Sequence, residues 1–222
     1  MVFVLAAIAA IAFAIWRNKV NQARMATLVA WASKNGFSYT EEDDSVTQLS
    51  RYHPFDTGHS RRATSVLNGT DAGRNVLAFD YSYVTTSTDA QGHSHSETHH
   101  YVVVAIDLPC GVPEVQCTAE TLLTKAGHFL IDDIELESID FNDRFVVRGA
   151  DKKFATDVLN PRTMQALLDR PEVDWRFEGS TMLAWYQGTL EVADLETTIG
   201  TMRAVLDGVP EYLWRDHGAK QV

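Results

Sequence analysis

The sequence predicts an α+β fold: an N-terminal membrane helix followed by a mainly antiparallel, curled sheet with flanking helices and a C-terminal helix. Three observations lead to this prediction. The chain begins with an apolar run, its middle is rich in β-branched and aromatic residues, and its helical patterns occur in pairs or at the ends. Strands that follow one another without intervening helices favour an antiparallel sheet.

Every residue from Val2 to Trp16 is apolar, and Arg17 and Lys19 follow directly. A helix of this length spans roughly 22 Å, against a hydrocarbon core of roughly 30 Å. Trp16 can lie at the interface while the basic side chains reach the headgroups. A cleaved signal peptide and a buried core helix are the alternatives, but no basic residue precedes the run and the junction after it is a poor cleavage site. The sequence therefore predicts an uncleaved transmembrane anchor at residues 1–19.

Basic residues flank the apolar run only on its C-terminal side, at Arg17, Lys19 and Arg24. By the positive-inside rule, this bias predicts a single-pass protein of the cell membrane with its globular part in the cytoplasm. The formal net charge of −11 lies entirely outside the apolar run. Because phosphates repel so acidic a surface, nucleic-acid binding is excluded.

The elements after the anchor are predicted from periodicity and from capping residues. Residues 20–35 continue the helix, and Asn35-Gly36 ends it. Asn68-Gly69 and Gly179-Ser180 indicate hairpin turns. We expect strands at residues 36–40, 62–68, 75–86, 97–108, 114–118, 132–137, 144–149, 174–178 and 181–187.

Helix starts are marked by side chains that can cap a first turn. Ser45 with Gln48 forms a capping box, Asp151 is an N-cap, and Asn160-Pro161 pairs an N-cap with proline at the first helical position. A short helix or turn is expected at residues 119–127, and a final amphipathic helix at residues 192–206. No clear linker divides the chain, so residues 20–35 are predicted as a connecting helix and residues 36–222 as a single α+β domain.

Signatures of common enzymes are absent from the sequence. There is no G-x-G-x-x-G, Walker loop, G-x-S-x-G or H-E-x-x-H. This absence favours a protein that is not an enzyme, and no catalytic or cofactor-binding residue is assigned. Cys110 and Cys117 lack the spacing of a zinc or redox motif, which leaves a disulfide or two free thiols, and a cytoplasmic location favours the thiols.

Histidines gather in one polar stretch between two predicted strands. In an extended strand His93, His95, Glu97 and His99 share one face, with neighbours roughly 6.6 Å apart. Two imidazoles at that spacing can converge on zinc or nickel. The alternative is a plain polar hairpin tip. The sequence therefore yields a metal-site hypothesis at these four residues.

Three stretches resemble an uncharacterised family of small bacterial membrane-anchored proteins with a domain of unknown function. They are residues 58–64 with 78–83, residues 133–147, and residues 153–161. The resemblance implies no activity, substrate or catalytic residue.

Anchor, acidic body and missing catalytic motifs together predict a membrane-anchored binding or scaffolding module at the cytoplasmic face, with a protein partner still to be identified. The alternative is a membrane-tethered metal-binding protein or metalloenzyme that uses the hairpin His93–His100.

Overall fold

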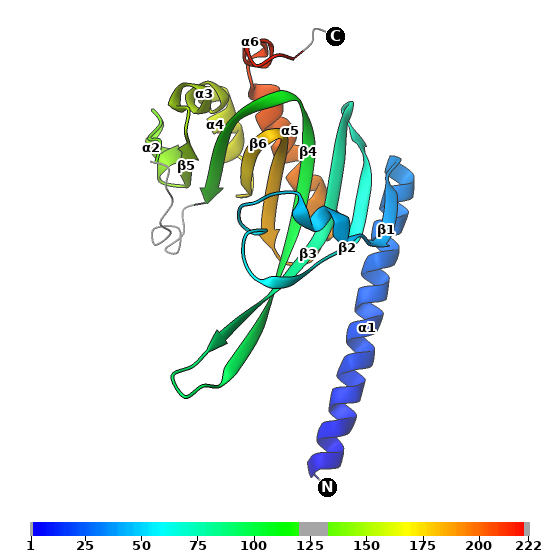
Figure 1. Ribbon diagram of the computed structural model, residues 1–222. Coiled ribbons are helices and arrows are strands. Elements are labelled where there is room, and N and C mark those ends of the chain that lie inside the picture. The colour runs from blue at the N-terminus through cyan, green and yellow to red at the C-terminus, as the bar shows by residue number, and fades with distance from the viewer. Residues whose placement is uncertain (1, 120–132, 220–222) are drawn as a thin grey trace.

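Figure 1 shows the computed structural model, which describes the backbone of residues 2–119 and 133–219 and the side chains from residue 11 onward within those ranges. The described residues form one six-stranded antiparallel sheet in the order β1-β2-β3-β4-β5, with β6 also paired to β4. The strands are β1 (Ser38–Glu42), β2 (His59–Asp71), β3 (Arg74–Thr88), β4 (Ser94–Ala119), β5 (Phe145–Gly149) and β6 (Asp174–Gln187). The α+β class and the antiparallel pairing are confirmed, and the sheet is open.

The longest strand, β4, joins two parts of the sheet. Its first half lies between β3 and β6, and its second half lies between β5 and β6. The sequence predicted two separate strands here because Pro109, Gly111 and Pro113 interrupt the pattern. The chain instead stays extended through them, and the register with β6 shifts between Asp107 and Val115. The prolines therefore mark a bulge in one strand.

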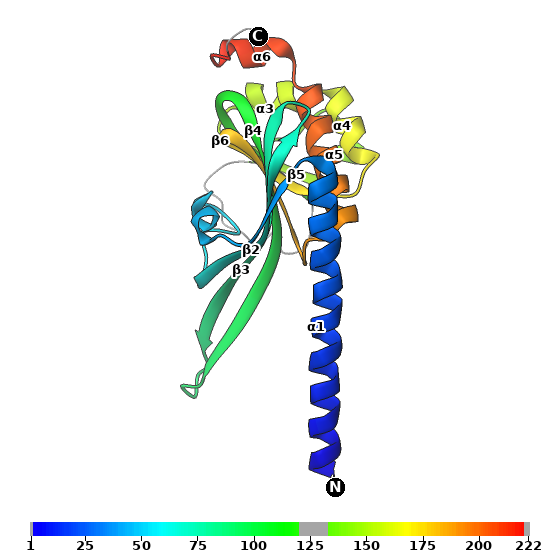
Figure 2. The same ribbon diagram turned by 90° about the vertical axis from the view of Figure 1, so that its right-hand side faces the viewer.

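Helices and a loop cover opposite faces of the sheet (Figure 2). On one face lie α1 (Val2–Asn35) and α5 (Val192–Gly208), with the shorter α3 (Lys152–Val158), α4 (Pro161–Leu168) and α6 (Glu211–Asp216) at one end. The short α2 (Ile139–Asn142) lies beside β5 (Figure 1). On the other face lies the loop of residues 43–58, which contains the 3₁₀ helix η1 (Asp44–Gln48). Each face buries its own apolar cluster.

Neither Asn68-Gly69 nor Gly179-Ser180 forms the hairpin turn that the sequence predicted. Asn68-Gly69 lies within β2, and the turn falls at Ala72-Gly73, where both residues have positive φ. A Cβ on Gly69 would meet the Phe37 ring at 2.5 Å, so this glycine permits close packing rather than a turn. Gly179, with a φ of 59°, is likewise a bend within β6, which pairs with β4 on both sides of it.

In residues 133–143 the predicted alternation of buried and exposed side chains is observed, but the predicted strand is not. Ile134 and Leu136 are buried while Glu135 and Glu137 are exposed. Only an isolated bridge from Asp133 to Arg148 pairs with the sheet, and the short helix α2 follows. The helix or turn expected at residues 119–127 lies almost wholly outside the described residues.

Helix α1 is unbroken from Val2 to Asn35, as the prediction of one continuous rod required. Its C-terminal half packs on the body through Leu28 and Ala32, which are fully buried. In the part of the chain that the structure describes, no helix is both long enough and apolar enough to cross a membrane. The transmembrane prediction at residues 1–19 finds no support there, and the side chains of residues 1–10 lie outside the described part.

Two extensions leave the body in the same direction. One is the N-terminal half of α1, and the other is the hairpin formed by the end of β3 and the start of β4 (Figures 1 and 2). The hairpin is paired from Val84↔Thr98 to Thr88↔Ser94 and is largely exposed. Its tip carries the histidines that the sequence singled out.

Candidate functional site

A buried carboxylate fastens α1 to the body. Asp80 on β3 accepts a hydrogen bond from Arg24 Nη1 at 2.8 Å and from the Leu190 amide at 2.6 Å, and the same arginine nitrogen donates to the Leu190 carbonyl at 3.0 Å. Both charged side chains are largely buried, at 14% and 13% exposure. From the sequence, Arg24 was expected only to help set the orientation of the chain in the membrane. The sequence did hold an indication, because Asp80 interrupts an otherwise apolar strand and a buried charge requires a partner.

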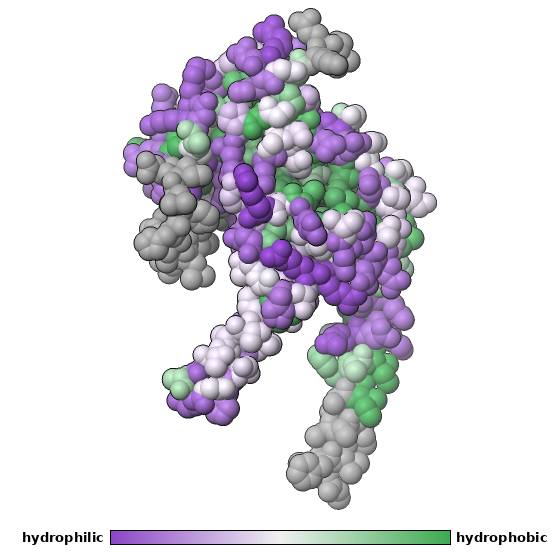
Figure 3. All heavy atoms as spheres, viewed as in Figure 1, coloured by the Kyte–Doolittle hydropathy of each residue, from purple (hydrophilic) through white to green (hydrophobic). Residues whose placement is uncertain are grey.

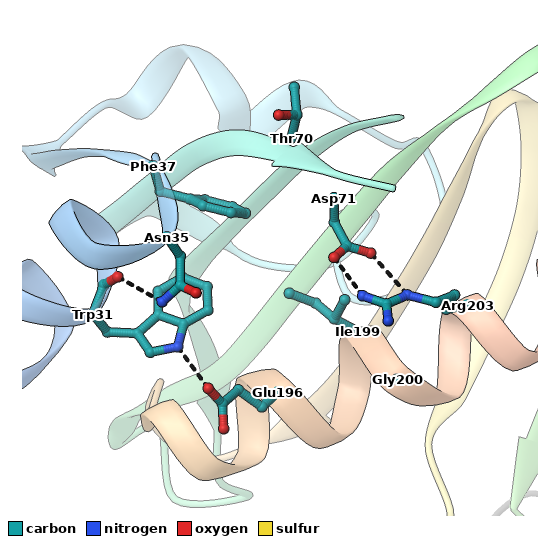
Figure 4. Close-up of a pocket in the computed structure, with 9 residues that line it drawn as sticks. All are labelled: Trp31, Asn35, Phe37, Thr70, Asp71, Glu196, Ile199, Gly200 and Arg203. Carbon is teal, nitrogen blue, oxygen red and sulfur yellow. Dashed lines mark hydrogen bonds and ion pairs between the residues drawn. The ribbon is translucent and has the colours of Figure 1, made fainter. Parts of the chain in front are cut away.

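A pocket of about 240 Å³ lies between α1, β2 and α5 (Figure 4). Aromatic, aliphatic and polar side chains line it together. The lining residues are Trp31, Asn35, Phe37, Thr70, Asp71, Glu196, Ile199, Gly200 and Arg203.

The polar groups around this pocket are mostly paired with each other. Trp31 Nε1 donates to Glu196 at 2.8 Å, and Arg203 donates through two nitrogens to Asp71. Asn35 donates to the Trp31 carbonyl at 2.8 Å. A ligand would have to break these bonds, and each broken bond costs free energy. The pocket is therefore best explained as the seam where α1 and α5 are fastened to the sheet.

Two larger hollows lie on either side of the loop Gly188–Glu191, which joins β6 to α5. One, of about 470 Å³, is lined by residues 171–173, 186–189, 191, 194, 197 and 198. The other, of about 580 Å³, lies against α1 and is lined by residues 14, 17, 18, 20, 21, 24, 189 and 191. Thr189 and Glu191 line both hollows, which the loop separates, and we refer to the two hollows together as the 188–191 groove.

The 188–191 groove is acidic on its α5 side. Burial raises the pKa of the Tyr186 phenol, and the nearby carboxylates of Asp194, Asp80 and Glu191 raise it further. Glu191 is the N-cap residue of α5 but makes no side-chain capping bond. No local sequence motif predicts this groove, because its lining residues come from two distant segments, residues 14–24 and residues 171–198.

The opposite face of the sheet holds a buried arginine that has a structural role. Arg176 on β6 is 1% exposed and lies over the rings of Tyr52 and Trp185, at 4.6 and 5.1 Å from their centroids. It donates hydrogen bonds to Ser50 and Gln116, and burial lowers its pKa. Arg176 thus holds the loop of residues 43–58 against the sheet.

At the hairpin tip two of the four predicted metal ligands, His93 and His95, meet one carboxylate, and a third, His99, lies apart from them. His93 lies in the turn, where its Nδ1 is 3.2 Å from Asp89 Oδ2, and His95 Nε2 is 3.5 Å from the same oxygen. His99 lies further along β4, stacked on Tyr83 with its Nε2 2.8 Å from Thr85 Oγ1. Asp89 also accepts the amide of His93, which lowers the pKa of its carboxyl.

Among the described residues, no group of three or more His, Cys, Asp or Glu side chains is arranged to hold a metal ion. The metal hypothesis at His93, His95, Glu97 and His99 stays a prediction, with Asp89 as the carboxylate that both tip histidines meet. Cys110 and Cys117 are free thiols, and burial raises the pKa of Cys117 well above its ordinary value.

The chain matches no protein-family model, and no curated protein matches it. The resemblance to an uncharacterised membrane-anchored family therefore has no support from a family model. The chain is similar in fold to the crystal structure of the mycobacterial trehalose monomycolate transport factor A, TtfA. The TM-score is 0.61 at 16% identity, over 84% of this chain and 96% of that one. At this identity the similarity concerns the fold.

Proposed function

We propose that this protein is a membrane-associated binding module that serves transport in the cell envelope. The observation that carries the proposal is the exposed apolar surface of α1. Ile11, Phe13 and Trp16 are 61%, 59% and 60% exposed and touch nothing in the body that would cover them. Phe13 and Trp16 contact each other, with ring centroids 5.8 Å apart, whereas at 3.6 residues per turn Ile11 points to the opposite side of the helix. A helix that is apolar on opposite sides is covered by lipid more readily than by one partner helix.

The polar band that follows the apolar run supports a membrane boundary at Trp16. In Figure 3 the described apolar residues of α1 are green and are followed directly by purple, hydrophilic side chains. Arg17 and Lys19 stand on this side of the run. We therefore propose that the run up to Trp16 enters the membrane and that the body lies on the cytoplasmic side.

The packing of α1 supports a module held at a fixed height above the membrane. The helix is continuous, and its second half is fastened by the Arg24–Asp80 ion pair, the Trp31–Glu196 hydrogen bond and the burial of Leu28. We propose that this connection holds one side of the body, with the 188–191 groove, next to the lipid surface.

The similarity to TtfA supports the link to envelope transport. It spans nearly the whole of the TtfA chain and therefore concerns the complete fold, not one common motif. A binding or scaffolding role in transport also agrees with the absence of catalytic motifs in the sequence.

Membrane association is tested by flotation of the full chain with phosphatidylcholine vesicles. The wild-type protein should float, and the double substitution Ile11→Lys with Ile15→Lys should leave it at the bottom of the gradient. A lysine in the apolar core of a bilayer costs about 2.5–3.5 kcal/mol. Ala26→Lys, at an exposed position beyond the run, is the control and should float. Equal flotation of all three proteins would refute the proposal.

Orientation and transport are tested in cells. A reporter fused after Val222 that is active only outside the cytoplasm would overturn the proposed orientation. Deletion of the protein should leave newly made envelope lipids on the cytoplasmic side, as measured by surface labelling of radiolabelled lipids. Normal export in the deletion strain would remove the transport role while leaving the membrane association standing.

A further inference from the structure

The β3–β4 hairpin is the second extension that leaves the body on the side of the N-terminal half of α1 (Figures 1 and 2). We call residues 85–97 the hairpin arm and residues 89–95 its tip. The two strands of the arm are paired without a register shift from Thr85↔Glu97 to Thr88↔Ser94. A membrane that holds the apolar run of α1 therefore lies in the direction in which the arm points.

The length of the hairpin arm decides whether its tip reaches that membrane. The ion pair between Arg24 and Asp80 gives the two extensions a common starting level, because its atoms are 2.8 Å apart. From Asp80 to Asp89 the chain advances nine residues along β3, or about 30 Å. From Arg24 to Trp16 the helix advances eight residues, or about 12 Å. Even if bending and inclination of the arm left only half its length along the helix, about 15 Å, the tip would still reach the level of Trp16, where the proposed membrane boundary lies.

The side chains of the hairpin arm are polar and almost all exposed. Residues 85–97 include six serines and threonines and two histidines, and they contain no Lys, Arg, Val, Leu, Ile, Met, Phe, Tyr or Trp. Within the arm, Thr85 and Asp89 are partly buried and the other residues are exposed. Hydroxyls and imidazoles would lose their hydrogen bonds with water in the hydrocarbon core, but in the headgroup layer they can donate to phosphate and carbonyl oxygens. The composition of the arm therefore suits the headgroup layer and excludes the hydrocarbon core.

The carboxylate at the tip is already engaged by the chain itself. Asp89 accepts hydrogen bonds from the amides of Gln91 and His93, at 2.9 and 2.8 Å. The imidazole nitrogens His93 Nδ1 and His95 Nε2 lie 3.2 and 3.5 Å from its Oδ2. These contacts offset the charge of the carboxylate within the turn. The tip therefore meets lipid phosphates with hydroxyl and imidazole donors and not with a free carboxylate.

We propose that the hairpin tip rests in the lipid headgroup layer beside α1 and gives the body a second contact with the membrane. This inference rests on the membrane association proposed above. Serine and histidine side chains of the tip donate hydrogen bonds to the phosphate oxygens of the lipids. A single helix leaves the body free to tilt toward the bilayer or away from it, whereas a second contact to one side of the helix restrains that tilt.

Fluorescence quenching of the full chain in phosphatidylcholine vesicles tests this contact. A small water-soluble fluorophore is attached at Gln91→Cys in a Cys110→Ala background, where the fully buried Cys117 is the remaining native cysteine. A chelator is present so that the result does not depend on a metal at the histidines. A nitroxide on the lipid headgroup should quench this label at least about twice as strongly as a nitroxide in the acyl chains, because polar residues are excluded from the core. The control label at Glu211→Cys, on α6 at the opposite end of the body, should be quenched by neither.

A shortened arm tests whether the tip restrains the tilt of the body. Replacing residues 87–95 by Asn-Gly keeps the pair Thr86↔Ser96 next to a two-residue hairpin turn. Because α1 is unchanged, the shortened chain should float like the wild type. The body should tilt over a wider range, so the residual fluorescence anisotropy of the label at Glu211→Cys on vesicles should fall by roughly half.

The outcomes separate this inference from the proposed function. If the full chain does not float with vesicles, the membrane association and the inference both fail. If it floats but the label at residue 91 is quenched no more than the label at residue 211, the membrane association stands and the inference is refuted. Stronger quenching by the acyl-chain nitroxide, or an unchanged anisotropy in the shortened chain, would likewise refute it.

Discussion

The fastening of α1 to the body predicts a large effect for one substitution, Asp80→Ala. The wild-type carboxylate accepts two hydrogen bonds, from Arg24 at 2.8 Å and from the Leu190 amide at 2.6 Å. Hydrogen bonds to charged groups contribute about 1.5–3 kcal/mol each. Arg24 keeps its bonds to Asn21 and to the Leu190 carbonyl, so we take the lower part of the combined range. Asp80→Ala should therefore lower the free energy of unfolding by about 3–4 kcal/mol.

The assay is thermal unfolding of the full chain in a non-ionic detergent, combined with amide hydrogen exchange in residues 24–35. At about 2–4 °C per kcal/mol for a chain of this size, the midpoint should fall by about 5–15 °C. Exchange in the second half of α1 should become faster because the helix loses its fastening.

The matched control for this measurement is Asp107→Ala. Asp107 is exposed on β4 and accepts one hydrogen bond, from Asn75 at 2.9 Å. Its removal should cost less than about 1 kcal/mol. If Asp80→Ala unfolds at the same temperature as the control and leaves exchange in α1 unchanged, the ion pair does not hold the helix, and the argument for a fixed height above the membrane is refuted.

Three further predictions concern Gly69, His53 and the hairpin tip. Gly69→Ala should lower the free energy of unfolding by about 1–3 kcal/mol in chemical denaturation, because its Cβ would lie 2.5 Å from the Phe37 ring. Burial lowers the pKa of His53 below its ordinary value of 6.5. The folded protein therefore binds fewer protons than the unfolded chain, and stability should fall as the pH drops from 6.5 through the lowered pKa. His53→Gln should flatten this dependence, and an unchanged slope would contradict it. A metal site at the hairpin tip predicts that zinc co-purifies with the untagged chain and is lost when His93 and His95 become alanine. A chelator without effect on unfolding or hairpin exchange would show that hypothesis to be wrong.

Local signals in the sequence predicted local structure well. Asp151 and Asn160 cap α3 and α4 as expected, since each side chain accepts from an amide of its own first turn. The final amphipathic pattern became α5, with Leu195, Ile199 and Met202 buried. These outcomes depend only on residues within a few positions of one another.

Most of the predictions that failed depend on distant residues, and one failed locally. Gly69 resembles a turn glycine in sequence, but it lies within β2, where the ring of Phe37, the residue directly before β1, packs against it. Ser45 resembles an N-cap, but Asp43 takes that role and accepts the amide of Ser45. The 188–191 groove could not be predicted from the sequence, because α1 and the β6–α5 loop are brought together only by folding.

The basic residues after the apolar run show how the structure changes an argument made from the sequence. Arg17, Lys19 and Arg24 all count equally toward orientation when the sequence is considered alone. The structure separates them, because Arg24 is buried against Asp80 and is required by the fold whichever side of the membrane the body occupies. The orientation therefore depends on Arg17 and Lys19. Since Arg17 also lines the hollow against α1, substituting Lys19 alone tests the orientation without changing the lining of that hollow.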